Sequence, residues 1–258
     1  MSIDLIKHPD GVALITLNRP EKLNAFDAEH YSQLANAWAE TRDDKQVRVV
    51  LITGAGEKSF STGADLKSFI GNPGDIAEFW QTQKGMLLNR GLEMWKPVIA
   101  AVNGYCLGGG MTLLLATDIR VAAEHATFGL SEVKRGIIPA NGGTQRVIEQ
   151  LPRTIGMEML LTGESINATK AERWGLVNQV VPAGDLMATA YALGQKIAKN
   201  APLAVQAAKE LALRARELSL SEGLRMEQLM NRMLTTTEDA KEGRTAFSEK
   251  REPRFTSS

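Results

Sequence analysis

Two short glycine-bearing segments have residue types suited to holding an oxyanion. They are FSTGADL at residues 60–66 and NGYCLGGGM at residues 103–111, and each leads toward a predicted helix. The first backbone N–H groups of a helix have no partner within it, and glycine leaves room for a carbonyl group to approach them. Two such turns could direct two donors at one oxygen, each contributing roughly 2.7–4 kcal/mol to a transition state. Close helix–strand packing explains a glycine triplet equally well, so both interpretations stay open.

Glu132 is the candidate for proton transfer. It lies in FGLSEVKRGIIPANGGTQR, residues 128–146, where most neighbours are apolar residues or glycines. A carboxyl group among apolar neighbours has a raised pKa, which suits a group that both accepts and donates a proton. The alternative is a solvated loop glutamate paired with Lys134 or Arg135.

Other patterns point away from nucleotide and metal chemistry. TGAGEKS at residues 53–59 lacks the spacing of a dinucleotide fingerprint and of a P-loop, so it indicates a tight turn. His8, His30 and His125 form no metal-binding spacing, and we expect each to be hydrogen-bonded or solvated. Cys106 is the only cysteine, which excludes an internal disulfide and a cysteine-based metal site. We expect no bound metal.

The elements that must position these residues alternate between strands and helices. Strand-like runs, rich in β-branched residues, cover residues 12–17, 47–53, 97–102, 118–123 and 177–181. Helical patterns cover residues 28–41, about 75–95 and 110–116. This order predicts an α/β core with largely parallel strands over residues 1–195. Residues 196–258 are predicted to be a helical region, with Ser221 and Thr237 as helix N-caps.

The composition is that of an ordinary globular protein. The 258 residues include 30 basic and 30 acidic ones, so no net field would recruit nucleic acid or an anionic membrane. No apolar run approaches the roughly 20 residues of a membrane span, and the N-terminal residues have no signal or transit character. We expect a soluble, cytoplasmic protein that binds neither nucleic acid nor membrane.

Five segments together resemble the crotonase (enoyl-CoA hydratase/isomerase) superfamily. They are RPEKLNAF, FSTGADLK, KPVIAAVNGYCLGGG, FGLSEVKRGIIPANGGTQR and TEDAKEGRTAFSEKREPRF, in family order along nearly the whole chain. The resemblance implies a spiral of ββα units with a C-terminal helical trimerisation region, assembled as a trimer or a dimer of trimers. It also implies an acyl-CoA thioester as substrate and no metal or redox cofactor.

The resemblance also implies roles for particular residues. The backbone N–H groups of Ala64 and Gly109 would form the oxyanion hole, and Glu132 would be the acid/base. Phe247 and Lys250 would reach the CoA moiety from the same or a neighbouring subunit. The residues that would contact the substrate or its CoA moiety are Lys22, Asn24, Ala25, Ala64, Asp65, Leu66, Lys67, Gly109, Asn141, Phe247 and Lys250.

Thr112 departs from the pattern of the hydratases that this chain resembles. Those enzymes place a second glutamate two residues after the glycine triplet, and a threonine hydroxyl can bind water there but cannot act as a base near neutral pH. The sequence therefore favours hydration or isomerisation of an unsaturated acyl-CoA. A single-glutamate Δ3,Δ2-enoyl-CoA isomerase, a hydratase-lyase and a thioester hydrolase remain alternatives. An RNA-binding relative and a catalytically inactive acyl-CoA-binding relative are more remote ones.

The acyl group cannot be identified from the sequence. The resemblance implies an acyl pocket within residues 69–95, where five aromatic and methionine side chains could equally be core: Phe79, Trp80, Met86, Met94 and Trp95.

Overall fold

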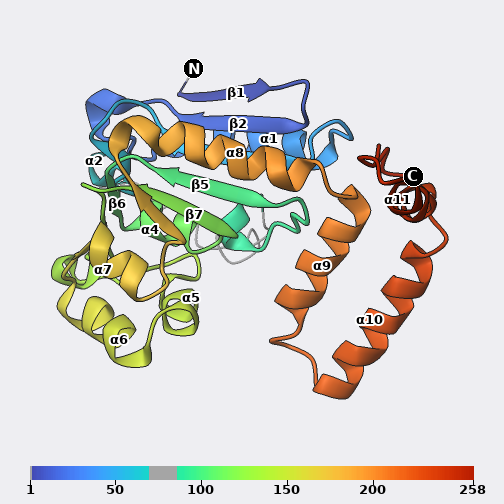
Figure 1. Cartoon of the computed structure of the whole chain (residues 1–258). Coiled ribbons are helices and arrows are strands. Elements are labelled where there is room, and N and C mark those ends of the chain that lie inside the picture. The colour runs from blue at the N-terminus through green and yellow to red at the C-terminus, as the bar shows by residue number, and fades with distance from the viewer. Residues whose placement is uncertain (1, 70–85) are drawn as a thin grey trace.

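The structure, a computed structural model, describes residues 2–69 and 86–258 and contains a six-stranded sheet at its centre (Figure 1). The strand order is β1-β2-β3-β5-β7-β10, with β1 antiparallel to β2 and the other neighbours parallel. The strands are β1 (Ile3–Lys7), β2 (Val12–Leu17), β3 (Val49–Gly54), β5 (Val98–Val102), β7 (Ile119–Ala123) and β10 (Gln179–Val181). The predicted α/β core with largely parallel strands is confirmed.

Both faces of this sheet are buried, which explains why its strands are almost continuously apolar. Val49 and Leu51 of β3 face a core closed by α8 (Leu186–Ala198). Val50 and Ile52 face the opposite core, which is closed by α1 (Ala28–Asp43) and a second sheet. Alternate residues of one strand thus serve two cores, because successive side chains point to opposite faces.

The second sheet has four short strands in the order β4-β6-β8-β9, and the first three are parallel. These strands were not predicted from the sequence, since two or three residues show no periodicity. They are β4 (Ser59–Ser61), β6 (Tyr105–Leu107), β8 (Thr127–Gly129) and β9 (Ile166–Asn167). β4, β6 and β8 follow β3, β5 and β7 of the large sheet within a few residues. The chain therefore winds between the two sheets in repeated ββ units.

A short helical segment follows each of these three units. The segments are α2 (Leu66–Phe69), α4 (Gly109–Leu114) and the 3-10 turn η3 (Glu132–Arg135). Three further helices were not predicted from the sequence: α5 (Gly143–Gln150), α6 (Arg153–Thr162) and α7 (Ala168–Arg173). The helix predicted around residues 75–95 is wrong where it can be checked: residues 75–85 lie outside the described residues, and residues 86–95 contain only the 3-10 turn η2 (Leu88–Arg90). Two more 3-10 turns are η1 (Pro20–Lys22) and η4 (Ala183–Asp185).

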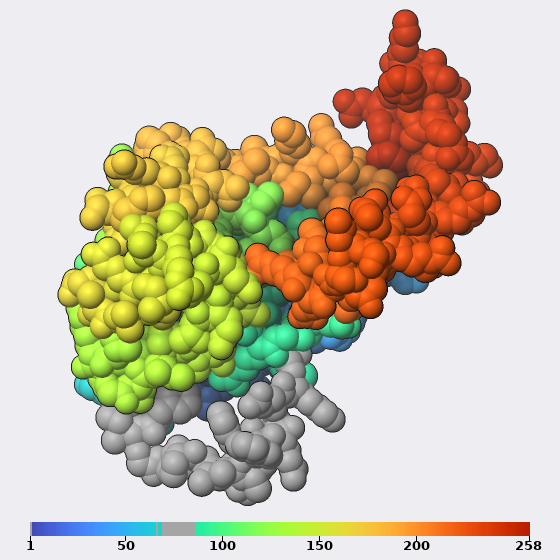
Figure 2. All heavy atoms as spheres, turned by 90° about the horizontal axis from the view of Figure 1, so that it is seen from below, coloured from blue at the N-terminus to red at the C-terminus, as the bar shows by residue number. Residues whose placement is uncertain are grey.

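After α8 the chain leaves the core as three helices that we call the C-terminal arm: α9 (Pro202–Arg214), α10 (Leu220–Leu234) and α11 (Glu238–Glu249). Figures 1 and 2 show the arm extending from the body of the molecule. The predicted boundary at residue 195 falls within α8, which packs on the large sheet up to Ala198. Thr237 caps α11 as predicted, but Ser221 lies inside α10. Ser219 is the cap there, in a reciprocal capping box with Glu222.

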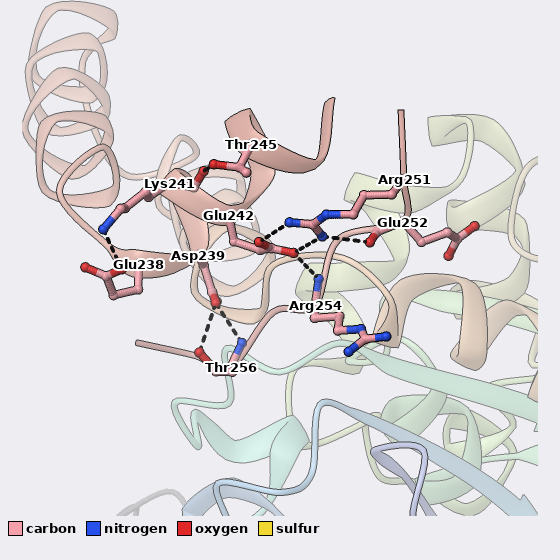
Figure 3. Close-up of a pocket in the computed structure, with 9 residues that line it drawn as sticks. All are labelled: Glu238, Asp239, Lys241, Glu242, Thr245, Arg251, Glu252, Arg254 and Thr256. Carbon is pink, nitrogen blue, oxygen red and sulfur yellow. Dashed lines mark hydrogen bonds and ion pairs between the residues drawn. The ribbon is translucent and has the colours of Figure 1, made fainter. Parts of the chain in front are cut away.

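The last residues fold back and tie the arm to the core. Asp239 is buried and accepts hydrogen bonds from the backbone N–H groups of Thr256 (2.7 Å) and Ser257 (3.0 Å). Arg251 forms an ion pair with Glu242 at 2.6 Å (Figure 3). Arg48, which precedes β3, donates to the carbonyl oxygen of Phe255 at 2.6 Å. The tail therefore links α11 to the central sheet. No helix among the described residues is long and apolar enough to cross a membrane.

Candidate functional site

The three parallel strands of the small sheet bring the predicted site residues to one edge. Ala64 follows β4, Gly109 follows β6 and Glu132 follows β8, each two or three residues after its strand ends. Because β6 lies between β4 and β8, Gly109 lies between the other two segments. The carboxyl ends of parallel strands meet at the same edge of a sheet, so this arrangement follows from strand order.

The backbone at Ala64 is oriented by a bridge to Phe26. Phe26 donates to the carbonyl oxygen of Gly63 (2.8 Å) and accepts from the N–H of Asp65 (2.8 Å). In a parallel bridge these two bonds flank the central residue, whose own N–H therefore points away from Phe26. Neither this N–H nor that of Gly109 has an acceptor among the described residues. Both groups remain available as donors.

Gly63 makes the close approach of the two donors possible. It has φ +85°, and a Cβ on it would lie 2.4 Å from the nitrogen of Gly109. A Cβ on Gly109 would in turn lie 3.4 Å from the nitrogen of Ala64. Any side chain at position 63 would separate the two turns. Gly63 lies within the FSTGADL segment, but its own role was not predicted from the sequence.

The glycine triplet serves packing as well as approach. Gly108 has φ +52°, and a Cβ on Gly110 would lie 2.3 Å from the carbonyl oxygen of Ser61. Gly109 begins α4, with Gly108 at the N-cap position. The sequence left two interpretations open, and they apply to different members of the triplet. Gly110 fits close packing, and Gly109 presents an N–H that has no acceptor in the described part of the chain.

Glu132 lies beside the triplet with its carboxylate partly buried. Its Oε1 is 3.4 Å from the position that a Cβ on Gly108 would occupy. Its Oε2 is buried and has no hydrogen-bond partner among the described residues. Burial raises the pKa of this carboxyl above its ordinary value, although its own backbone N–H and the charge of Arg135 oppose the shift. Such a group is suited to exchange a proton with a ligand.

Thr112 is buried beneath Gly109. Its hydroxyl donates to the carbonyl oxygen of Gly109 at 3.0 Å and accepts from the side-chain amide of Asn89 at 3.1 Å. Asn89 is buried as well. The only hydroxyl proton of Thr112 is thus directed at the loop that carries the Gly109 N–H, and the hydroxyl supports that loop.

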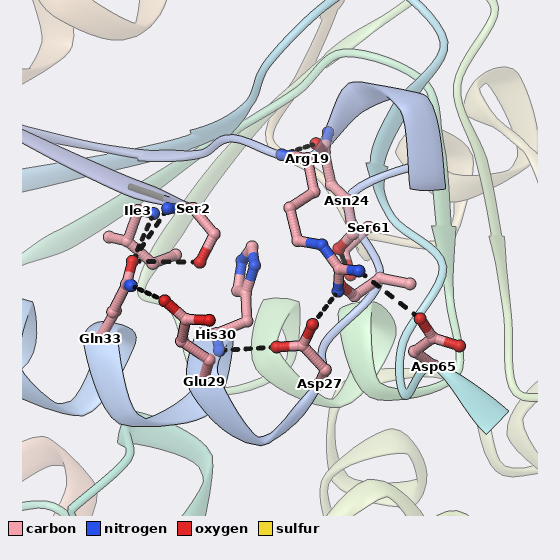
Figure 4. Close-up of polar contacts among 11 residues, drawn as sticks. Ser2, Ile3, Arg19, Asn24, Asp27, Glu29, His30, Gln33, Ser61 and Asp65 are labelled. Atoms are coloured by element: carbon pink, nitrogen blue, oxygen red, sulfur yellow. Dashed lines mark hydrogen bonds and ion pairs between the residues drawn. The ribbon is translucent and has the colours of Figure 1, made fainter. Parts of the chain in front are cut away.

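The segment predicted to lie along CoA is held by an arginine that the sequence analysis did not single out (Figure 4). Arg19 donates to the carbonyl oxygen of Ala25 (2.9 Å) and forms ion pairs with Asp27 (2.7 Å) and Asp65 (3.6 Å). The amide of Asn24 is fully buried and donates to the carbonyl oxygen of Ser59 at 2.7 Å. Asn24 therefore joins this segment to β4, and because the whole residue is buried, the predicted direct contact of Asn24 with CoA is wrong.

His30 lies under the same network. It is fully buried, and neither ring nitrogen has a hydrogen-bond partner among the described residues. Burial, helped by the charge of Arg19 and opposed by that of Asp27, lowers the pKa of His30 to about 4. The expectation that His30 is hydrogen-bonded or solvated is wrong, because the ring is fully buried and packs against that of Phe26, with 5.2 Å between the centroids.

The other predicted contact residues are divided between this site and the arm. Lys22 and Lys67 are exposed near it, and Leu66 begins α2. Phe247 is 88% exposed on α11, where Lys250 ends the helix. Figure 1 shows α4 within the body of the molecule and α11 on the far side, at the outer end of the arm. The site of one chain therefore does not contain Phe247 or Lys250 of that same chain.

The predicted acyl-pocket residues also separate. Phe79 and Trp80 lie outside the described residues. Met94 is buried in the core, Met86 is exposed, and Trp95 stacks under Arg214, whose Cζ is 5.2 Å from a ring centroid.

Asn141 reaches the site through a neighbour. Its side-chain oxygen accepts a hydrogen bond from Nε of Arg90 at 2.7 Å, and the Arg90 guanidinium lies 5.5 Å from the ring centroid of Tyr31. The hydroxyl oxygen of Tyr31 is 3.5 Å from the position of a Cβ on Gly109. Nothing in the residue types of Tyr31, Asn89 or Arg90 indicated this role.

Comparison with known proteins gives matches along nearly the whole chain. The family described as enoyl-CoA hydratase/isomerase matches residues 7–258. The chain is 43% identical over 244 residues to (E)-benzylidenesuccinyl-CoA hydratase of Thauera aromatica, which covers 95% of each protein. It is 42% identical over 245 residues to carnitinyl-CoA dehydratase of Salmonella arizonae, 93% of each. The crystal structure of enoyl-CoA hydratase from Bacillus anthracis has a TM-score of 0.92 to this chain at 37% identity, covering all of both.

Proposed function

The chain belongs to the crotonase (enoyl-CoA hydratase/isomerase) superfamily as an acyl-CoA-processing enzyme, and from this we propose that it adds water to the double bond of an unsaturated acyl-CoA, with Glu132 as the acid/base. The fold is the predicted crotonase-like one. The observation that carries the proposal is the meeting of two backbone N–H groups, at Ala64 and Gly109, beside the partly buried carboxylate of Glu132. Within residues 2–69 and 86–258 neither N–H has an acceptor.

The two N–H groups would act as an oxyanion hole. A thioester carbonyl placed between them gains negative charge when its α-carbon takes on enolate character. Donors that are already in position stabilise that charge with little reorganisation, by roughly 2.7–4 kcal/mol each in comparable sites. Both lie on backbone held by strand and bridge hydrogen bonds, which favours such preorganisation.

Glu132 would move the proton. In hydration its carboxylate accepts a proton from water while the water oxygen bonds to C3, and the carboxylic acid then delivers that proton to C2. The net change is addition of one water. A raised pKa brings the two protonation states of Glu132 closer in free energy near neutral pH, which favours a group that must use both. The reaction uses only groups of the chain, so we propose no resident cofactor.

Thr112 supports a second candidate, double-bond isomerisation. Because its hydroxyl proton is directed at Gly109, Thr112 is poorly placed to hold the attacking water as a second carboxylate would. Glu132 alone suffices to carry a proton between two carbons. The relatives named above are called hydratases or dehydratases, which favours hydration.

Self-association would complete the CoA side of the site. Apolar side chains are exposed along the C-terminal arm, among them Leu220, Leu224, Met233 and Phe247. We propose that the arm joins copies into a trimer or a dimer of trimers, in which Phe247 and Lys250 of one copy approach Lys22 and Lys67 of another. Leu224→Glu should then lower the mass seen by light scattering. An unchanged mass would count against this interface. The predicted cytoplasmic location remains a prediction.

Replacing Glu132 by glutamine tests the function. With a short trans-2-enoyl-CoA, Glu132→Gln should lower turnover roughly 10²- to 10⁴-fold while binding of the saturated acyl-CoA persists. Glu158→Gln, an exposed change on α6, is the matched control. In water labelled with ¹⁸O and deuterium, oxygen label at C3 identifies hydration, and deuterium at carbon without new oxygen identifies isomerisation. Full activity of Glu132→Gln would exclude it as the acid/base.

A further inference from the structure

Arg90 places a positive charge next to the proposed oxyanion hole. Its guanidinium lies over Tyr31, and the hydroxyl end of Tyr31 approaches Gly109. Tyr31 therefore connects this charge to the turn that carries the Gly109 N–H. The preceding residue, Asn89, donates to Thr112, so the backbone that carries Arg90 is itself fixed beneath α4.

The orientation of Arg90 is set from two sides. Asn141 accepts the hydrogen bond of its Nε, and Arg146 in turn donates to the carbonyl oxygens of Asn141 (3.0 Å) and Asn89 (3.1 Å). These bonds join the turn before α5 to η2. They leave the two terminal nitrogens of Arg90 without a hydrogen-bond partner among the described residues. Among the described residues no carboxylate forms an ion pair with the guanidinium of Arg90.

An arginine held in this way is suited to bind an anion. Its planar fork matches both oxygens of a carboxylate, and the hydrogen bond to Asn141 and the ring contact with Tyr31 reduce the freedom that would be lost on binding. The CoA phosphates are assigned to Lys22 on η1 and Lys67 on α2, whereas Arg90 lies on η2. The anion nearest Arg90 would then belong to the acyl group.

We propose that Arg90 binds a carboxylate on the acyl group, so that the preferred substrates are CoA thioesters of dicarboxylic acids. This inference rests on the proposed function, since it uses the thioester position defined by Ala64 and Gly109. Asn141 is a positioning residue in this arrangement and acts through Arg90. The specificity is electrostatic and therefore differs from recognition by an apolar acyl pocket.

Binding of unreactive ligands tests the inference separately from catalysis. The ligands are saturated acyl-CoA esters of graded chain length that end in a carboxylate, and matched esters that end in a methyl group. Calorimetry on the full-length protein should give tighter binding of the carboxylate series by about tenfold at its best length. Arg90→Gln should remove this preference and leave the methyl series unchanged.

Three variants separate recognition from a purely structural role. Arg90→Lys should keep part of the preference because the charge remains. Asn141→Ala should reduce it by less than Arg90→Gln does. Arg173→Gln, an exposed change on α7, should leave both series as in the wild type.

Equal binding of the two series by the wild type would overturn the inference, as would an equal loss of both in Arg90→Gln. If the two series bind with the expected difference but no enoyl-CoA is turned over, only the proposed reaction is rejected and the inference about Arg90 stands.

Discussion

Replacing Gly63 by alanine should separate the two proposed oxyanion donors. The new Cβ would lie 2.4 Å from the nitrogen of Gly109 and 3.1 Å from the carbonyl oxygen of Leu107. An ordinary contact begins near 3.4 Å, so the two turns must move apart by about 1 Å. Both obstacles are backbone atoms, which cannot rotate away as a side chain can.

The magnitude follows from two separate costs. Alanine at φ +85° is strained by about 1–2 kcal/mol, which lowers the free energy of unfolding. A displacement of about 1 Å at a reacting group typically lowers turnover about 10²-fold, and loss of one oxyanion donor lowers it about 10²- to 10³-fold. We therefore expect Gly63→Ala to lose two to three orders of magnitude in kcat and only a small part of its stability.

Gly175→Ala is the matched control for backbone strain. Gly175 has φ +75°, and a Cβ there would meet nothing within 4 Å. Turnover of a trans-2-enoyl-CoA and urea unfolding are measured for both variants. The control should lose similar stability and keep its turnover. The reasoning is refuted if Gly63→Ala keeps turnover within a few-fold of the wild type, or if the control loses as much activity.

Three further predictions concern buried polar groups. Glu132→Gln should raise the free energy of unfolding at pH 7, because the pKa of Glu132 is raised in the folded state and the unfolded state therefore loses the proton first as pH increases. This gain in stability should shrink toward pH 4, and urea titrations at both pH values check it. Protonation of His30 should lower the free energy of unfolding by up to about 3 kcal/mol as pH falls from 6.5 to about 4, because the unfolded state binds the proton first. His30→Leu should reduce this dependence of the unfolding free energy on pH. Thr112→Val should lower stability by about 1–3 kcal/mol, since the buried amide of Asn89 loses its acceptor, and should reduce turnover, whereas Thr112→Ser should preserve both. Lost turnover at full stability would instead indicate contact between this hydroxyl and the substrate.

Much of the large sheet could be predicted from the sequence. Five of its six strands are runs of β-branched and small apolar residues long enough to show a pattern, and burial on both faces made them continuous. The small sheet could not be predicted in this way. β4, β6 and β8 have three residues each, and their pairing depends on partners more than 20 residues away in the chain. The same holds for Ser219, whose capping role depended on a register that Ser221 fitted equally well.

The sequence by itself determined which groups are available for chemistry. The glycines of two turns, one carboxyl in an apolar segment and a threonine where the resembled hydratases have glutamate are all local properties of the chain. The tertiary structure decided which of them meet, because strand order in the small sheet places the turn after β6 between the turns after β4 and β8. It also decided the role of Thr112, whose hydroxyl could be assigned only once Asn89 and the Gly109 carbonyl oxygen were found beside it. Arg90 belongs wholly to this second group, since its place beside Tyr31 and Asn141 arises from three segments that are remote in sequence.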